Sequence, residues 1–167
     1  MSATTPATAV LQVREACRDD LDWLAEGAIA MARETEDKRL DPDTVRAGIA
    51  AGLDDPAKAR YFVAERDGAR AGTLMLTREW SDWRNGAWWW IQSVYVAPAH
   101  RRQGVFAALY RHVEVLAREA PGVIGLRLYV ESDNSAAQRT YTALGMCDAG
   151  YRLYESDWSQ GGGSEKP

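Results

Sequence analysis

The chain has 167 residues, which is enough for one domain with a hydrophobic core and too few for two domains of ordinary size. Hydrophobic residues make up 46% and charged residues 26%, an ordinary globular composition, and the net charge of -4 argues against a nucleic-acid-binding surface. With only two cysteines and two histidines, the chain is expected to hold no disulfide scaffold and no metal site.

The sequence contains no run of about 20 apolar residues and no basic, apolar leader at its start, so we expect a cytoplasmic protein that does not bind membranes. Residues 1–9 are expected to form a disordered N-terminus. Residues 10–158 are expected to form a single domain, followed by a flexible tail over 159–167.

In the first third of the chain, residues 10–15 alternate between apolar and polar types, which predicts a strand. Apolar residues at helical spacing predict a helix over 19–33, and the acidic stretch 34–37 is expected to be a loop. A second helix is expected over 42–53, because proline is tolerated in a first helical turn.

The middle third is typical of β-structure. Asp67 and Gly68 lie between two apolar runs, 61–65 and 72–77, and this pattern predicts a hairpin. A polar loop that carries two tryptophans is expected over 79–86, and a further strand over 87–96.

The last third predicts an amphipathic helix over 102–119, a buried strand over 123–130, a helix over 134–144, and a final strand or hairpin over 146–154. A strand, a helix and a second strand in succession imply a parallel crossover. The fold class is therefore α/β (α+β in the stricter sense), with a mixed sheet that is mostly antiparallel and helices on both faces.

The segment from Arg101 to Phe106 reads Arg-Arg-Gln-Gly-Val-Phe and joins a predicted strand to a predicted helix. The first turn of a helix offers unpaired backbone N–H groups and the positive end of the helix dipole, which favour an anion. Arg101 and Arg102 add positive charge, and Gly104 lets the backbone approach a bulky phosphate. The segment predicts a pyrophosphate site; the alternative is a solvated basic turn.

A second informative segment, over 134–146, reads Asn-Ser-Ala-Ala-Gln-Arg-Thr-Tyr-Thr-Ala-Leu-Gly-Met. With the first, it resembles the GNAT superfamily of N-acetyltransferases. That family has Arg/Gln-x-x-Gly-x-Gly/Ala after a strand ending in Val-x-Pro, and then Asn-x-x-Ala-x-x-x-Tyr-x-x-x-Gly-Phe. The second pattern is matched here by Asn134, Ala137, Tyr141 and Gly145. Phe106 and Met146 depart from the family patterns, and the resemblance covers roughly residues 91–146.

The resemblance implies acetyl-CoA as co-substrate. It implies that the strand ending at Val96 splays from the strand over 123–130, so that pantetheine pairs with free backbone groups there and a backbone N–H polarises the thioester. Asn134 would hold the pantetheine arm, and Tyr141 would give a proton to the departing CoA thiolate. The implied acetyl-CoA-binding residues are Val94, Tyr95, Val96, Arg101, Arg102, Gln103, Gly104, Val105, Phe106, Asn134, Ala137 and Tyr141.

Direct transfer requires a neutral amine, so some group or a water chain must take its proton. The candidates for this base are Glu79, Asp82, Glu34 and Glu36. Glu79 is preferred because it lies just past the third predicted strand, and its alternative is a solvated loop acid. Glu34 and Glu36 lie between the first helices, which border the acceptor pocket in this superfamily, and they are candidates for binding a cationic acceptor.

Trp80 and Trp83 are unusual in a polar loop, because tryptophan is seldom exposed unless it covers something. They are candidates for an aromatic wall of the acceptor site, and the alternatives are a dimer contact or packing on residues 88–90.

The function expected from these residues is an acetyl-CoA-dependent N-acetyltransferase, in which a primary amine attacks the thioester directly. The acceptor is expected to be a small molecule, with a small cationic amine favoured. The alternatives are a non-catalytic acyl-CoA sensor on the same fold and a protein N-acetyltransferase. The resemblance is also compatible with a homodimer. The sequence lacks both GxxxxGK[ST] and GxGxxG, which disfavours a nucleotide-binding protein.

Overall fold

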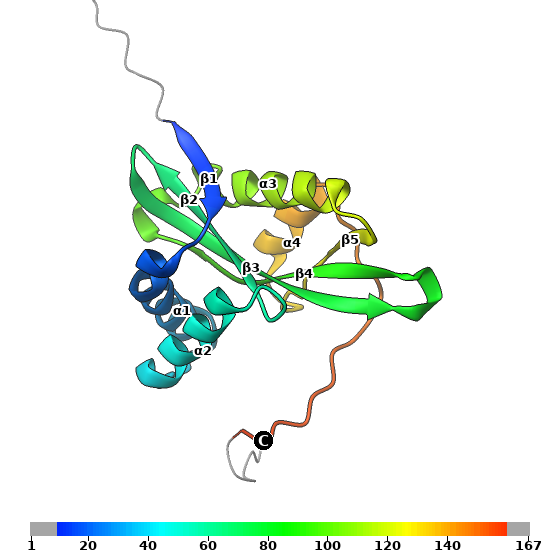
Figure 1. The fold of residues 1–167 in the computed structure, drawn as a ribbon, viewed down its shortest axis with the longest axis horizontal. Coiled ribbons are helices and arrows are strands. Elements are labelled where there is room, and N and C mark those ends of the chain that lie inside the picture. The colour runs from blue at the N-terminus through cyan, green and yellow to red at the C-terminus, as the bar shows by residue number, and fades with distance from the viewer. Residues whose placement is uncertain (1–9, 160–167) are drawn as a thin grey trace, which may run out of the picture. The chain divides into compact units, whose positions relative to one another are not determined.

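A computed structural model describes residues 10–159 (Figure 1). The internal contacts divide the chain into two compact parts, and the boundary lies between Tyr129 and Val130. The predicted N-terminal segment 1–9, and the predicted tail apart from Ser159, lie outside the described residues. Within the described range, no helix is both long and apolar enough to cross a membrane.

Among residues 10–159, the first part contains a sheet, three α-helices and three short 3-10 turns, and the second part contains one α-helix. The strands are β1 (Leu11–Glu15), β2 (Arg60–Arg66), β3 (Ala69–Ser81), β4 (Gly86–Val96) and β5 (Val123–Arg127). The α-helices are α1 (Leu21–Glu36), α2 (Pro42–Asp54), α3 (Val105–Glu119) and α4 (Ser135–Ala143). The 3-10 turns are η1 (Arg18–Asp20), η2 (Asp82–Arg84) and η3 (Pro98–His100).

The five strands lie in the sheet in the order of the sequence. β1 to β4 pair antiparallel, and β4 pairs parallel with β5 after the crossover through α3. The predicted mixed sheet with one parallel pair is confirmed. Asp67 and Gly68 form the two-residue turn between β2 and β3, both with positive φ, as a hairpin turn of type I′ requires.

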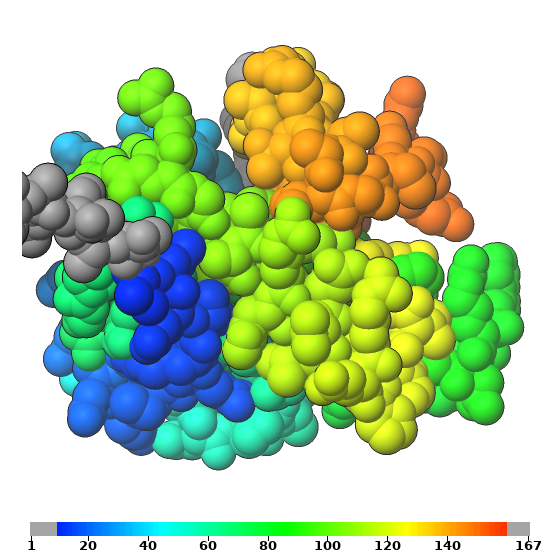
Figure 2. Space-filling view, turned by 90° about the horizontal axis from the view of Figure 1, so that it is seen from above, coloured from blue at the N-terminus to red at the C-terminus, as the bar shows by residue number. Residues whose placement is uncertain are grey.

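Helices cover both faces of the sheet, as Figure 1 shows. On one face, α1 and α2 form a core cluster with Tyr61 and Val63 of β2. On the other face, α3 lies so close to β3 that a methyl group on Gly72 would meet a side-chain carbon of Val105 at 2.6 Å. Figure 2 looks onto this second face, where α3 (yellow-green) forms the surface. Alternate side chains along a strand therefore point to two different faces, one covered by α1 and α2 and the other by α3.

Several predicted boundaries are wrong, and each difference has a local cause. The predicted loop 34–37 is instead the last turn of α1, which ends where Asp37 takes the left-handed conformation. The helix predicted from residue 102 begins at Val105, because Arg102 and Gly104 have positive φ. The tryptophan-bearing loop predicted over 79–86 is shorter, since β3 pairs with β4 as far as Ser81.

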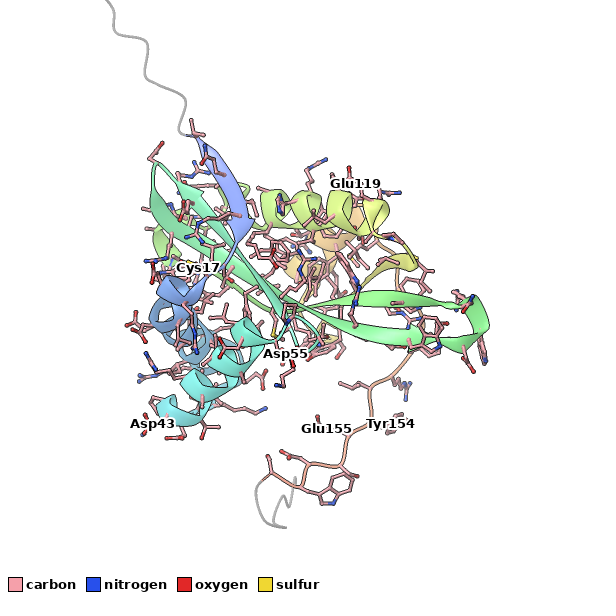
Figure 3. All side chains as sticks on the ribbon, viewed as in Figure 1. Cys17, Asp43, Asp55, Glu119, Tyr154 and Glu155 are labelled. Atoms are coloured by element: carbon pink, nitrogen blue, oxygen red, sulfur yellow. The ribbon has the colours of Figure 1, made fainter. Side chains whose placement is uncertain are left out.

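Two predictions at the C-terminal end are wrong. The strand predicted over 123–130 is half-buried and ends at Arg127. The structure shows no strand over 146–159, and Tyr154 and Glu155 lie on an extended segment (Figure 3). Alternating apolar residues suggested a strand there, but a strand also needs a partner backbone.

A buried carboxylate joins β1, β3 and the start of α1. Asp20 is 0% exposed and accepts hydrogen bonds from Arg14 (2.7 and 3.0 Å), from Arg70 (2.7 Å) and from the backbone N–H of Cys17 (2.9 Å). Burial alone would raise the pKa of Asp20, but the hydrogen bonds from Arg14, Cys17 and Arg70 outweigh it and hold that pKa well below its usual range. The carboxylate is therefore charged wherever the protein is folded at ordinary pH.

Replacing Asp20 with asparagine is expected to lower the free energy of unfolding by about 2 kcal/mol, because it leaves two arginines without their shared anion. Urea unfolding at pH 7 measures this. Asp54→Asn is the matched control: Asp54 also binds an arginine, Arg18 at 2.7 Å, but it is exposed, so the expected loss is below about 1 kcal/mol. Because the folded pKa of Asp20 is depressed, its contribution is full above about pH 5 and decreases as the pH falls below about 4. Equal losses in the two variants would contradict this role.

Candidate functional site

The loop between β4 and α3 has the geometry of an anion site. β4 ends at Val96, η3 follows, and Arg101 to Gly104 form turns before α3 begins. Gly104 is the N-cap of α3 with a φ of 79°, and no described atom lies within 4 Å of the position that a Cβ there would take. The first N–H groups of α3 have no partner within the helix, so they face open space beside a glycine.

Three arginines surround this helix terminus. Arg101 donates from Nε to the carbonyl of Val96 (3.0 Å) and from Nη2 to Glu34 (2.6 Å), and Arg102 is exposed. Arg66, at the end of β2, donates to the carbonyl of Gln103 (2.9 Å). The side chains around the loop thus hold its backbone in place and add positive charge to the helix dipole.

Phe106, which departs from the family pattern, lies in the first turn of α3. Its ring is half-buried and lies against the buried ring of Tyr110, with 6.4 Å between the ring centroids. The side chain packs along α3, and a side chain in that position does not remove the backbone donors at the start of the helix.

The second feature is a break in the sheet beside this loop. β4 and β5 pair only from Ala87↔Val123 to Trp90↔Arg127, although β4 continues to Val96. A register shift against β3 and a positive φ at Ser93 accompany the break. The second half of β4 therefore has no strand partner on its β5 side among residues 10–159, as the predicted splay requires.

Only the backbone of this segment is directed to the break. The side chain of Tyr95 points to the face of the sheet that α1 covers. There its ring lies against Gly27 of α1, and its ring centroid is 6.2 Å from that of Trp23. A ligand strand beside Val94, Tyr95 and Val96 would meet backbone N–H and C=O groups, the same groups that pair two strands.

The residues predicted from the second segment lie on α4. Asn134 is its N-cap, and its Oδ1 accepts from the backbone N–H of Ala137 (3.0 Å). Tyr141 lies two turns further along the same helix and is half-buried, and this burial raises the pKa of its phenol. Gly145 follows the helix with a φ of 90°. Tyr141 is thus protonated at neutral pH.

The structure does not bring the predicted acceptor residues together. Glu34 pairs with Arg101 of the β4–α3 loop at 2.6 Å, and Glu36 pairs with Lys38 at 2.5 Å. Glu79 pairs with Trp88 across the strands, and Trp80 is the next residue, so their side chains lie on opposite faces of the sheet. Glu79 and Trp80 therefore do not face the same side of the sheet.

Trp80 and Trp83 lie near the tip of the long β3–β4 hairpin, which projects past β5 in Figure 1, and they are 64% and 86% exposed. Both oxygens of Glu79 accept hydrogen bonds, one from the indole of Trp90 and one from Arg127 (2.9 Å). Sequence reasoning missed Arg66 and Arg127, whose contacts join residues far apart in the chain. The alternation of Trp88, Trp90 and Gln92 was a usable signal that these three side chains lie on one face of the sheet.

Comparisons with known proteins give a family match and several relatives. The family model described as "Acetyltransferase (GNAT) family" matches residues 19–146. The mycothiol acetyltransferase of Parafrankia sp. (strain EAN1pec) is 33% identical over 88% of this chain and 50% of its own length. That of Streptomyces coelicolor is 32% identical over 77% of this chain and 39% of its own length. The chain thus spans about half the length, or less, of these curated relatives.

Solved structures show the same fold. A possible acetyltransferase from Clostridium difficile 630 is 41% identical, with a TM-score of 0.81 over 88% of this chain and 97% of that one. The aminoglycoside N-acetyltransferase AAC(6')-Iy, solved with CoA, is only 16% identical, with a TM-score of 0.74 over 93% of this chain and 99% of that one, and supports the fold alone. With a family match that covers most of its length, this chain belongs to the acetyltransferase (GNAT) family.

Proposed function

We propose that the chain binds acetyl-CoA at the loop 101–106 and transfers its acetyl group to the nitrogen of a primary amine. One observation carries the proposal. The half of β4 that has no β5 partner leads, through η3 and a short loop, to the open start of α3 at Gly104. An amide-bearing arm fits the first feature, and a pyrophosphate fits the second. Acetyl-CoA has both groups in that order.

In the proposed reaction, the neutral amine nitrogen attacks the thioester carbonyl carbon, and the carbon–sulfur bond breaks as the amide forms. A backbone N–H of β4 near Val94 stabilises the negative charge that develops on the carbonyl oxygen. Tyr141 donates a proton to the departing CoA thiolate, and burial favours this role because it keeps the phenol protonated. The attacking nitrogen releases its extra proton to water or a base.

The pantetheine arm is assigned to the backbone of Val94 and Val96 and to Asn134. Asn134 already uses one side-chain oxygen to cap α4, and its amide N–H₂ group supplies the donors for a ligand carbonyl. The pyrophosphate is assigned to Arg101, Arg102 and the backbone of Gln103 to Phe106, with Val105 and Ala137 as apolar neighbours.

The acceptor is proposed to be a small-molecule amine. Glu34, Glu36 and Glu79 each bind a cationic side chain of this chain, so these carboxylates give no argument for a cationic acceptor. The names of the relatives favour an acceptor related to mycothiol, but this chain covers half of their length or less. The proposal is therefore limited to a primary amine.

Calorimetric titration with acetyl-CoA, desulfo-CoA and ATP tests the donor site. Both CoA compounds are expected to bind at least tenfold more tightly than ATP, because only they carry the pantetheine arm. Release of free CoA thiol in the presence of amines then tests turnover. Binding without turnover of small amines or peptides would favour a sensor, and acetylation of peptides alone would favour a protein N-acetyltransferase. No binding of either CoA compound would refute the proposal.

A further inference from the structure

A cluster of aromatic and charged side chains lies where the pairing of β4 and β5 stops. We call it the ring shelf, and its members are Glu79, Trp88, Trp90, Arg127 and Tyr129. Trp90 and Arg127 form the last residue pair of the two strands. The ring centroids of Trp90 and Tyr129 are 5.8 Å apart, and the guanidinium of Arg127 lies 4.2 Å from the ring centroid of Trp88.

The charges of the ring shelf compensate each other. Glu79 accepts from the indole N–H of Trp90 through one oxygen and from Arg127 (2.9 Å) through the other, so one carboxylate fixes both neighbours. The side chains of Glu79 and Arg127 are 42% and 26% exposed, and Tyr129 is 59% exposed. The surface thus offers fixed aromatic rings around a compensated Glu79–Arg127 pair, and the guanidinium of Arg84, 5.6 Å from the ring centroid of Trp88, adds a positive charge at its edge.

The ring shelf lies on the more open face of the sheet. On the opposite face of β4, Trp89 and Ile91 are only 4% and 3% exposed. On the shelf face, α1 and α2 pack over Tyr61 and Val63, while Gln92 further along β4 is half-exposed and bonds to Thr77 (2.6 Å). Within residues 10–129, the shelf face of β4 is therefore the more exposed of its two faces where the pairing with β5 ends.

This inference rests on the proposed function, which fixes where the thioester lies. Pantetheine would run from the loop at Gly104 back along β4, so its sulfur end would lie towards the closed end of the gap. Trp90 lies four positions before Val94, and four positions along a strand span about 13 Å between Cα atoms. An amine that attacks the thioester would have the rest of its molecule on or beside the ring shelf.

We propose that the ring shelf binds the acceptor through a flat, apolar ring, and that an extended arm of the acceptor carries the amine from the shelf to the thioester. Rings stack on, or lie edge-on to, fixed tryptophan and tyrosine rings, whereas a linear chain makes fewer contacts and loses more rotational freedom. A polycation finds no uncompensated carboxylate there. The enzyme therefore prefers a ring-bearing amine to a linear aliphatic amine or a polyamine.

The indole N–H signals of the seven tryptophans provide a test that needs no turnover. The signal of Trp90 is assigned by Trp90→Phe, and the protein with CoA is titrated with 4-phenylbutylamine, n-butylamine or spermidine. 4-Phenylbutylamine is expected to shift the Trp90 signal at a concentration at least tenfold below the other two amines. Equal responses to the three amines, or no shift of the Trp90 signal, would overturn the ring shelf.

A kinetic comparison adds a matched pair of variants. Tyr129→Leu removes an exposed ring of the shelf, and Val115→Ala changes an equally exposed residue on α3 at the opposite face. Tyr129→Leu is expected to reduce the ratio of kcat/KM for 4-phenylbutylamine over n-butylamine about tenfold, and Val115→Ala to leave it unchanged. An unaltered ratio in Tyr129→Leu would contradict the assignment.

The two proposals fail in different ways. Loss of acetyl-CoA binding would refute the proposed function, while the Trp90 signal would still report whether a ring binds the shelf. Conversely, tight acetyl-CoA binding with no response of Trp90 to any ring-bearing amine would overturn the shelf alone.

Discussion

Gly104→Glu is expected to abolish acetyl-CoA binding, with an affinity loss of at least about 100-fold, or about 2.7 kcal/mol. Gly104 has a φ of 79° and faces open space at the start of α3. A glutamate there would place a carboxylate where the proposed pyrophosphate binds, and two like charges at that distance repel. The side chain would also fill the space that lets the backbone donors reach the phosphates. Calorimetric titration with acetyl-CoA measures the effect.

The control must separate this effect from backbone strain, because a non-glycine residue in the left-handed region costs about 1–2 kcal/mol of stability by itself. Gly68→Glu provides that control. Gly68 has a φ of 80°, also faces open space, and lies in the β2–β3 turn. Both variants are expected to unfold at similarly lowered urea concentrations, but only Gly104→Glu to lose acetyl-CoA. Retained affinity in Gly104→Glu, or equal losses in both, would refute the loop assignment.

Local patterns in the sequence were sufficient for the features that depend on neighbouring residues. Asp67 and Gly68 predicted the first hairpin because a two-residue turn needs positive φ at both positions. The apolar stripe of α3 predicted that helix, and its residues Val105, Leu109 and Val113 are buried. The parallel crossover followed from the order of these elements.

The long-range contacts of the fold and of the site could not be predicted from local patterns, because they join residues that are distant in the sequence. Glu34 and Arg101 are 67 residues apart, Asp20 and Arg70 are 50 apart, and Glu79 and Arg127 are 48 apart. Which carboxylate meets which arginine depends on the register of the strands and on where each helix ends. Knowing that β3 continues as far as Ser81 would have separated Glu79 from Trp80, since neighbouring residues of a strand lie on opposite faces.

Tyr141→Phe is expected to lower kcat about 100-fold with little change in the affinity for acetyl-CoA, because the ring is kept and only the proton donor is lost. Tyr61→Phe is the matched control: burial raises the pKa of both phenols, but Tyr61 belongs to the core cluster beneath α1 and α2. Its loss of kcat is expected to be below twofold. Stopped assays of CoA release, with calorimetric affinities, measure both variants.

The pH dependence gives a second check on the role of Tyr141. The acid must be protonated to act, and its pKa is raised above the ordinary tyrosine value of about 10, so it stays in its active form throughout the neutral and moderately alkaline range. The ratio of wild-type to Tyr141→Phe kcat is therefore expected to stay constant between about pH 7 and pH 9. A ratio that falls within this range would mean that the phenol ionises there, and equal kcat in the two proteins would remove Tyr141 from the proton transfer altogether.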